Sequence, residues 1–146
     1  MIQFKWCTFS ELSVSELYAV LALRSDVFVR EQQCAYLDLD GKDQSARHLL
    51  GSTDDAVGAY LRLFPPLASE TCVVFGRVVT APSMRSRGYG KLLIQEMLNY
   101  CAENFKGIPV QCSAQLYLKH FYEGFGFKAF GDVYGEDNIP HIAMKL

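Results

Sequence analysis

Alternation of hydrophobic and polar residues predicts a chain rich in β-strands. Ile2, Phe4 and Trp6 alternate with polar neighbours, the period of two expected of a strand with one buried face. The β-branched run at 72–80 is instead typical of a central strand that is buried on both faces. Turn formers at 52–55 predict a hairpin. By these criteria, strands are expected over residues 2–6, 47–51, 56–64, 72–80 and 109–113, with two more in the last twenty residues.

Helical spacing predicts three helices between these strands. Ser13 and Glu16 form a capping box, so a helix is expected over about 14–29, followed by an ordered loop at 31–47 with a short helix. The apolar face of the second helix consists of Leu93, Ile94, Met97, Leu98 and Cys101. A third helix is expected over 115–125. The order β-α-β-β-β-α-β-α-β-β in one domain, residues 1–146, predicts a mixed α/β (α+β) fold with helices packed on the faces of a sheet.

Composition narrows the classes of protein that this fold can represent. Fourteen Lys and Arg against sixteen Asp and Glu give a net charge of −2, without the positive excess that usually accompanies nucleic-acid binding. The N-terminal residues alternate instead of forming the apolar block of a signal peptide, and no apolar run is long enough for a membrane helix. Five cysteines without a CxxC pair indicate neither a disulfide set nor a metal clamp. Free thiols are typical of the reducing cytoplasm, so we expect a cytoplasmic protein. The cysteine spacing predicts that it holds no metal.

The connection between the 72–80 strand and the second helix carries the most informative motif. It reads Arg85-Ser86-Arg87-Gly88-Tyr89-Gly90-Lys91. The two glycines remove Cβ atoms that would keep a bulky anion from the backbone, and the helix start points unpaired N–H groups at the same place. The pattern predicts a phosphate or pyrophosphate site, although a turn with solvated arginines fits these seven residues equally well. It has neither the Walker spacing nor the dinucleotide fingerprint.

Two motifs make the chain resemble the GNAT superfamily of acyl-CoA-dependent N-acetyltransferases. The signature [RQ]xxGx[GA] is matched by Arg85, Gly88 and Gly90, and the motif YxxxGF is matched by Tyr122, Gly126 and Phe127. The chain is most similar to the ElaA-like branch, through Leu23-Arg24, Val27-Phe28, Glu31-Gln32, Asp40-Gly41-Lys42-Asp43, His48, Gly76-Arg77-Val78, Ala114-Gln115, Phe121-Tyr122 and Ile139-Pro140-His141. Asn138 replaces a glycine that is frequent in that branch, and asparagine tolerates the same left-handed backbone.

The resemblance implies a GNAT fold with a mixed, mostly antiparallel sheet that splays in the middle. Acetyl-CoA, as co-substrate, is expected in the cleft where the 72–80 strand diverges from the 109–113 strand. The pyrophosphate would lie on residues 85–91. Residues expected to pair with the pantetheine arm through their backbone are Val78, Val79 and Thr80. A main-chain N–H near Val78 would face the thioester oxygen, and Gly76 would mark the bulge that the divergence requires.

The chemistry of acyl transfer suggests roles for individual side chains. Helical spacing alone favours a core tyrosine at Tyr122, whereas the YxxxGF motif of the resembled family implies that it protonates the leaving thiolate. Gln115 would hydrogen-bond the pantetheine or cap its helix. Candidates for the base that takes the proton of the amine are Glu31, His48 and His141, each of which also fits a structural role. Acidic residues of the loop, Glu31, Asp38, Asp40 and Asp43, form either an acceptor pocket for a cationic amine or a solvated face.

The resulting hypothesis is direct acetyl transfer to a small-molecule or peptide amine in a ternary complex. A ping-pong scheme through Cys101 or Cys112 is disfavoured, because neither cysteine lies in a nucleophile pattern. The alternatives are a CoA-binding sensor without turnover and an enzyme similar to acyl-homoserine-lactone synthases. The final strand, which alternates Ile142, Met144 and Leu146, would be available to pair across a homodimer.

Overall fold

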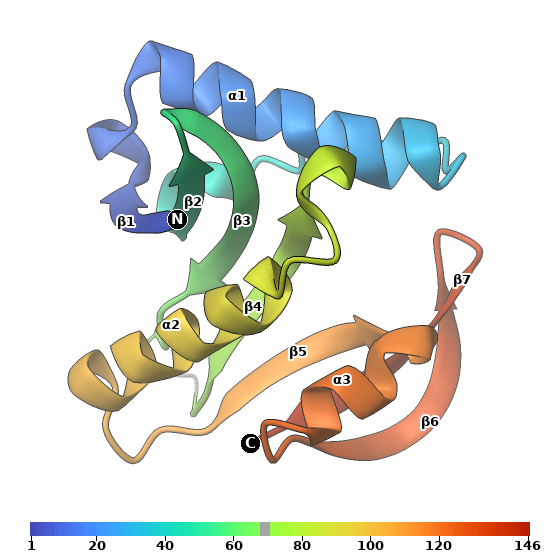
Figure 1. Ribbon diagram of the computed structural model, residues 1–146. Helices are drawn as coiled ribbons and strands as arrows, with labels where there is room; N and C mark the ends of the chain where they lie inside the picture. The colour runs from blue at the N-terminus through green and yellow to red at the C-terminus, as the bar shows by residue number, and fades with distance from the viewer. Residues whose placement is uncertain (68–70) are drawn as a thin grey trace.

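Seven strands form one mixed sheet in the computed structural model, which describes residues 1–67 and 71–146. The strands follow the order β1-β2-β3-β4-β5-β7-β6, in which all neighbours are antiparallel except β4 and β5. Their bounds are β1 Gln3–Thr8, β2 Arg47–Thr53, β3 Ala56–Phe64, β4 Val73–Thr80, β5 Val110–Gln115, β6 Lys128–Glu136 and β7 Ile139–Lys145. The α-helices are α1 Val14–Arg24, α2 Tyr89–Asn104 and α3 Lys119–Glu123 (Figure 1). The predicted order of elements and the mixed α/β class are confirmed.

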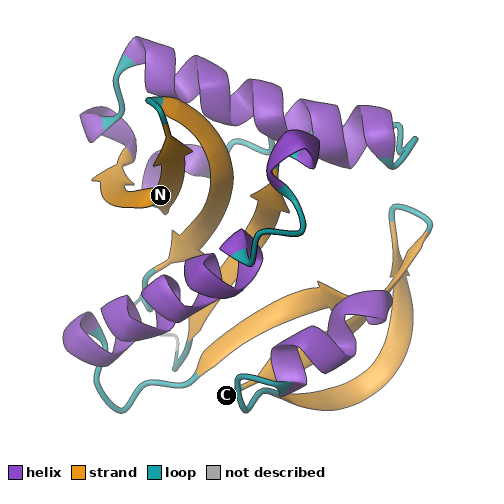
Figure 2. Cartoon of the chain, viewed as in Figure 1, coloured by secondary structure: helices purple, strands orange, loops and turns teal. Residues whose placement is uncertain are grey.

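Helices cover both faces of this sheet. Leu50 and Tyr60 pack with residues of α1, whereas their chain neighbours Leu49 and Leu61 pack with α2. Successive side chains of a strand point to opposite faces, so α1 lies on one face and α2 on the other (Figure 2). No helix in the described ranges combines the length and apolar character that crossing a bilayer requires.

The first helix begins and continues as its sequence predicts, but it changes geometry near its end. The Ser13 side chain accepts a hydrogen bond from the Glu16 N–H, and the Glu16 carboxylate accepts one from the Ser13 N–H. Beyond Arg24 the helix continues as a π-helical segment, Ser25–Glu31. Single π turns often occur at functional sites. This one brings the end of the segment to the cleft described below.

The third helix begins later than the sequence predicts, because residues 115–118 form a strand end and a 3₁₀ turn. Gln115 is the last residue of β5, a 3₁₀ turn follows at Leu116–Leu118, and α3 covers only Lys119–Glu123. The Gln115 side chain makes no capping hydrogen bond. The alternative role of this residue as a helix cap is therefore wrong.

The prediction that β4 is buried on both faces is also wrong. Only residues 73–75 of β4 pair with β5, so the two strands separate beyond Phe75. Val74 is 37% exposed because its face of the sheet borders this opening. The expected bulge is present, but its residue differs: the register with β3 shifts between Gly76 and Val79, and Arg77 has the positive φ of 52°. Gly76 adopts no such conformation.

The last strand is not available for the dimer contact expected from the sequence. β7 lies between β5 and β6, and both of its edges are hydrogen-bonded. The pattern of hydrophobic residues correctly identifies Ile142 and Met144 as buried, but Leu146, the third residue of the alternation, is 46% exposed and lies beyond the end of β7. The pattern does not reveal that the preceding strand, β6, forms the sheet edge.

Candidate functional site

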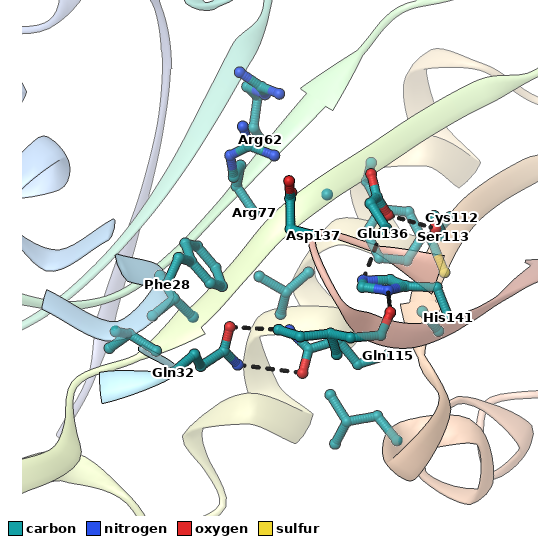
Figure 3. A pocket seen from close by; sticks show the side chains of 18 of the residues that line it. Phe28, Gln32, Arg62, Arg77, Cys112, Ser113, Gln115, Glu136, Asp137 and His141 are labelled. Carbon is teal, nitrogen blue, oxygen red and sulfur yellow. Dashed lines mark hydrogen bonds and ion pairs between the residues drawn. The ribbon is translucent and has the colours of Figure 1, made fainter. Parts of the chain in front are cut away.

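A cavity of about 680 Å³ opens where β4 and β5 separate. It extends from the start of α2, at Gly90, past Tyr122 to the turn between β6 and β7. The π-helical segment and the loop after it contribute further lining residues, among them Phe28 and Gln32 (Figure 3). The divergence of the two strands, which the resemblance implies, is thus confirmed, and it creates a continuous space between elements far apart in the sequence.

The start of α2 has the geometry required of an anion site. Gly88 precedes the helix with φ +78°, and Ser86 is also left-handed with φ +64°. Leu92 donates the first hydrogen bond back to Gly88. In the described residues, the amides of 86–91 have no protein acceptor. A Cβ at Gly88 would meet nothing within 4 Å. The helix mouth is therefore open and rich in free donors, as the anion-site prediction requires.

The guanidinium of Arg85 pairs with a carboxylate instead of standing free. Its two terminal nitrogens each lie 2.6 Å from an oxygen of Glu31. The hydrogen bond from Arg85 lowers the pKa of Glu31 below its ordinary value. An ionised carboxylate held in this way is a poor proton acceptor, so the geometry does not support Glu31 as the base. The pair instead ties the π-helical segment to the loop before α2.

The second half of β4 borders the cavity along the edge that β5 has left. Val78, Val79 and Thr80 all line it. Across the opening, Gln115 of β5 exchanges side-chain hydrogen bonds of 3.2 and 3.4 Å with Gln32 (Figure 3). Gln115 therefore faces the cavity, as the pantetheine role predicts. The side-chain amide of Gln115 hydrogen-bonds to Gln32 on the opposite wall of the cavity and does not cap the helix that follows β5.

Tyr122 lies at the middle of the cavity wall. Its ring packs against Phe75, Phe121 and Phe127 at centroid distances of 5.1–6.0 Å, and the residue is 4% exposed. Within the described residues, no side chain or backbone group hydrogen-bonds to its hydroxyl. Burial raises the pKa of Tyr122 above its ordinary value, so the phenol stays protonated. Tyr122 is therefore both a core residue and a lining residue of the cavity.

His141 lies on β7 beside Gln115 and lines the same cavity. Its Nδ1 is 2.7 Å from the Ile139 carbonyl oxygen. Because a carbonyl only accepts, Nδ1 carries the proton and the lone pair of the neutral imidazole is on Nε2. The Glu136 carboxylate lies 3.4 Å from Nε2 (Figure 3). Nε2 and the Glu136 carboxylate therefore face one another inside the cavity.

His48 has a structural role outside the cavity. The ring is 1% exposed, with Nδ1 2.6 Å from the Tyr60 hydroxyl and Nε2 2.9 Å from the Asp43 carbonyl oxygen. Burial lowers the pKa of His48. Both nitrogens are occupied by buried partners, so the geometry does not support His48 as the base.

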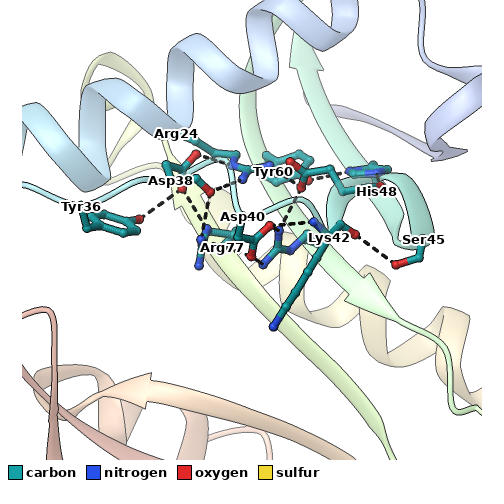
Figure 4. A network of polar contacts seen from close by, with 11 residues as sticks. Arg24, Tyr36, Asp38, Asp40, Lys42, Ser45, His48, Tyr60 and Arg77 are labelled. Carbon is teal, nitrogen blue, oxygen red and sulfur yellow. Dashed lines mark hydrogen bonds and ion pairs between the residues drawn. The ribbon is translucent and has the colours of Figure 1, made fainter.

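The acidic loop does not form a free acceptor pocket. Asp38 pairs with Arg24 at 2.9 Å and with Arg77 at 2.8 Å (Figure 4). Asp43 pairs with Arg24 at 2.8 Å and with Arg62 at 2.9 Å. Burial acts to raise the pKa of Asp43, but these guanidiniums hold it below the usual range. The carboxylates are neutralised by arginines, so they are unavailable to bind a cationic amine.

The two cysteines considered for a covalent scheme are poor nucleophiles. Burial raises the pKa of Cys101 to about 11 and that of Cys112 to about 12, so both thiols are protonated near neutral pH. Within residues 1–67 and 71–146, no group of three or more His, Cys, Asp or Glu side chains is arranged to hold a metal ion.

Sequence reasoning did not identify Glu136, Gln32 or Ser113 as part of the site. Ser113 hydrogen-bonds to the Glu136 carboxylate at 3.2 Å, and its hydroxyl also contacts Tyr134. A weak signal for Glu136 exists: Asp137 and Asn138, both with positive φ, make a two-residue turn that pairs Glu136 with Ile139. Recognition of that turn would place Glu136 beside His141. No local pattern identifies Gln32 or Ser113.

Comparisons with known proteins agree with this geometry. A family model described as "Acetyltransferase (GNAT) domain" matches residues 36–146. The chain is 42% identical over 146 residues to protein ElaA of Escherichia coli K12, covering 99% of this chain and 95% of that protein. The crystal structure of Escherichia coli ElaA matches with a TM-score of 0.93, 41% identity and 99% coverage of both chains. An acyl-CoA N-acyltransferase from Pseudomonas aeruginosa matches with a TM-score of 0.94, 39% identity and 99% coverage of both chains.

Proposed function

The chain belongs to the GNAT acetyltransferase family, and from this premise we propose that it transfers the acetyl group of acetyl-CoA directly to a primary amine. One observation carries the proposal: a single cavity runs from Gly90, in the first turn of α2 where the amides are free, past Tyr122 to His141. Direct transfer requires both substrates to meet in such a space. The five free thiols support a cytoplasmic location for this activity.

The residues present fit the diphosphate and pantetheine of acetyl-CoA. Amides of residues 86–91 are unpaired by protein groups in the described part of the chain, and Arg87 and Lys91 add positive charge beside them. The free edge of β4 at 78–80 offers backbone groups to the amides of the pantetheine arm. Gln115 would hydrogen-bond the same arm once its side-chain amide releases Gln32 and pairs with the ligand. A main-chain N–H near Val78 would stabilise the oxyanion.

Two side chains of the cavity would handle the protons of the reaction. In acetyl-CoA, the carbon that the amine attacks is the carbonyl carbon of the thioester. His141 Nε2 accepts a proton from the amine, directly or through water, and Glu136 stabilises the resulting imidazolium. As the new C–N bond forms and the C–S bond breaks, Tyr122 donates its proton to the thiolate. Solvent then returns the proton from His141 to Tyr122, which restores both groups.

Release of free CoA thiol by the purified protein tests this function. The protein is incubated with acetyl-CoA and a panel of primary amines. The proposal predicts amine-dependent release of thiol and formation of the acetylated amine. Saturable binding of acetyl-CoA without release for any amine would favour the sensor. Lactone formation with S-adenosylmethionine would favour the synthase-like alternative, and failure to bind acetyl-CoA at millimolar concentration would remove the basis of all three.

Replacement of His141 by asparagine should lower kcat/KM for the amine about tenfold. The loss is limited because the Glu136 carboxylate remains near the same point and accepts the proton through water. Steady-state kinetics with saturating acetyl-CoA measures the effect. As a control, His120→Asn changes a histidine whose side chain is 96% exposed and outside the cavity, and it should leave the rate unchanged. Equal rates for His141→Asn and the wild type would exclude His141 as the base.

A further inference from the structure

The part of the cavity beyond Tyr122 has two walls of different charge. Arg62 and Arg77 come from β3 and β4 on one side, whereas Glu136 and His141 come from β6 and β7 on the other (Figure 3). Strand β5 separates these pairs of strands in the sheet. In the proposed reaction, the amine of the acceptor substrate lies beside His141. The wall formed by Arg62 and Arg77, the arginine wall, therefore faces the rest of that substrate.

Arg77 is held in a fixed position at this wall. Its backbone has φ +52°, in the bulge that follows the separation of β4 and β5. A left-handed conformation is strained for a residue with a side chain and persists when surrounding contacts enforce it. The contacts are provided by Asp38, whose carboxylate and carbonyl accept hydrogen bonds from Arg77 Nε and Nη2 at 2.8 and 3.1 Å (Figure 4). The guanidinium also lies over the ring of Tyr36.

Both arginines of the wall retain unused hydrogen-bond donors. Each guanidinium has five N–H donors, and the aspartates of the network do not accept all of them. Within residues 1–67 and 71–146, Nη1 of Arg77 has no hydrogen-bond partner, and its side chain is 22% exposed. Arg62 is more deeply placed: its side chain is 6% exposed, and its buried Nε has no acceptor in the described residues. Buried donors are normally satisfied, so Arg62 Nε indicates a missing acceptor, whereas Arg77 Nη1 is not buried and remains accessible on a residue that lines the cavity.

The arginines and aspartates of the network balance in charge, so what this wall offers a ligand is hydrogen-bond donors and not a net positive charge. Three guanidiniums, Arg24, Arg62 and Arg77, face three carboxylates, Asp38, Asp40 and Asp43, so the network itself is neutral. The wall therefore presents preoriented N–H donors without a free anion of its own. A planar carboxylate matches the fork of a guanidinium, and the pairing is charge-assisted.

We propose that the acceptor is a zwitterion, a primary amine that also carries a carboxylate, as in an amino acid. Its carboxylate binds the unused donors of Arg77, and its amine lies near His141 and Glu136. Apolar side chains that line the same cavity, Phe28, Phe64 and Val74, provide surface for the carbon skeleton. This inference rests on the proposed acetyl transfer and adds the chemical class of the second substrate.

Matched pairs of amines test the inference. Each pair contains an amino acid and the amine that lacks its carboxylate: phenylalanine and phenethylamine, lysine and cadaverine, β-alanine and ethylamine. A phosphonate, 2-aminoethylphosphonate, shows whether the wall selects a carboxylate or any anion. We expect at least one amino acid to exceed its partner in kcat/KM by roughly 10- to 100-fold, the range for a charge-assisted hydrogen bond.

The variant Arg77→Gln separates recognition of the substrate carboxylate from differences in the intrinsic reactivity of the amines. It should reduce the ratio of kcat/KM within the pair about tenfold or more, and because both amines are assayed with the same variant, any general loss of activity cancels in that ratio. Asp38 remains paired with Arg24 in this variant, so the network keeps a charge partner for it. Arg30→Gln, at an exposed arginine outside the cavity, serves as the control.

The outcomes distinguish this inference from the function on which it rests. Acetylation of simple amines with equal or higher efficiency than all matched amino acids would overturn the zwitterion and leave acetyl transfer intact. An unchanged ratio in Arg77→Gln would overturn the role of Arg77. Preference for the phosphonate over β-alanine would overturn selection for a carboxylate. If no amine of either type is acetylated, the proposed function and the inference both fail.

Discussion

Replacement of Gly90 by valine should weaken acetyl-CoA binding about 100-fold without unfolding the protein. Gly90 is in the first turn of α2 and lines the cavity. An ideal Cβ at this position would lie 3.9 Å from Phe121 Cζ and 4.0 Å from Thr80 Oγ1, both ordinary contacts. In the proposed complex, the two γ-methyls of valine take up cavity space beside Phe121 and Thr80 that the bound acetyl-CoA requires. Loss of two charge-assisted hydrogen bonds at about 1.5 kcal/mol each gives an effect of this size.

The matched variant Gly90→Ala distinguishes steric blockage from general damage. A single Cβ fits, and alanine stands at this position in the family motif, so binding should stay close to wild type. Valine is no worse a helix former than glycine, so helix propensity alone does not destabilise Gly90→Val. Isothermal titration with acetyl-CoA and thermal unfolding of the three proteins provide the measurements. Wild-type affinity in Gly90→Val would show that the diphosphate does not lie at this helix start.

Replacement of Tyr122 by phenylalanine should lower kcat about 100-fold, the lower range for loss of a general acid. The hydroxyl has no protein hydrogen bond in the described residues, while the ring packs on three phenylalanines. Phenylalanine preserves that packing, so the free energy of unfolding should change little. The affinity for acetyl-CoA should also persist, because the hydroxyl acts only when the C–S bond breaks.

The pH dependence of this effect follows from the burial of Tyr122. Its raised pKa keeps the phenol protonated on the alkaline side of neutrality, so ionisation of Tyr122 should cause no loss of activity there. Stopped assays of wild type and Tyr122→Phe across pH, with Tyr18→Phe as an exposed control on α1, measure the comparison. Unchanged kcat in Tyr122→Phe would assign the proton to another group.

Local patterns in the sequence were sufficient for most of the fold and for one end of the site. The capping box of Ser13, the hydrophobic face of α2 and the glycine at position 88 act within one or two turns of chain, and the structure contains all three features. The loop with the free amides could therefore be located from its residues. The free amides in its first turn follow from helix geometry itself.

The rest depends on contacts between distant segments. Glu31 and Arg85 are 54 residues apart, and only the fold shows that their ion pair leaves Glu31 a weak base. The strain in the β4 bulge is on Arg77, although glycine at 76 is the residue that conformational preference favours. The interior position of β7 likewise follows from sheet order, which the alternation of hydrophobic residues does not encode. Helical periodicity over seven residues does not distinguish the π-helical segment from an α-helix.

A crystal structure of the protein with acetyl-CoA tests the central claim most directly. The account predicts diphosphate oxygens within hydrogen-bond distance of the amides that precede and begin α2, with the pantetheine along residues 78–80 and the thioester between Tyr122 and His141. Acetyl-CoA bound outside the space between β4 and β5, or bound there with its diphosphate away from Gly88 and Gly90, would contradict it.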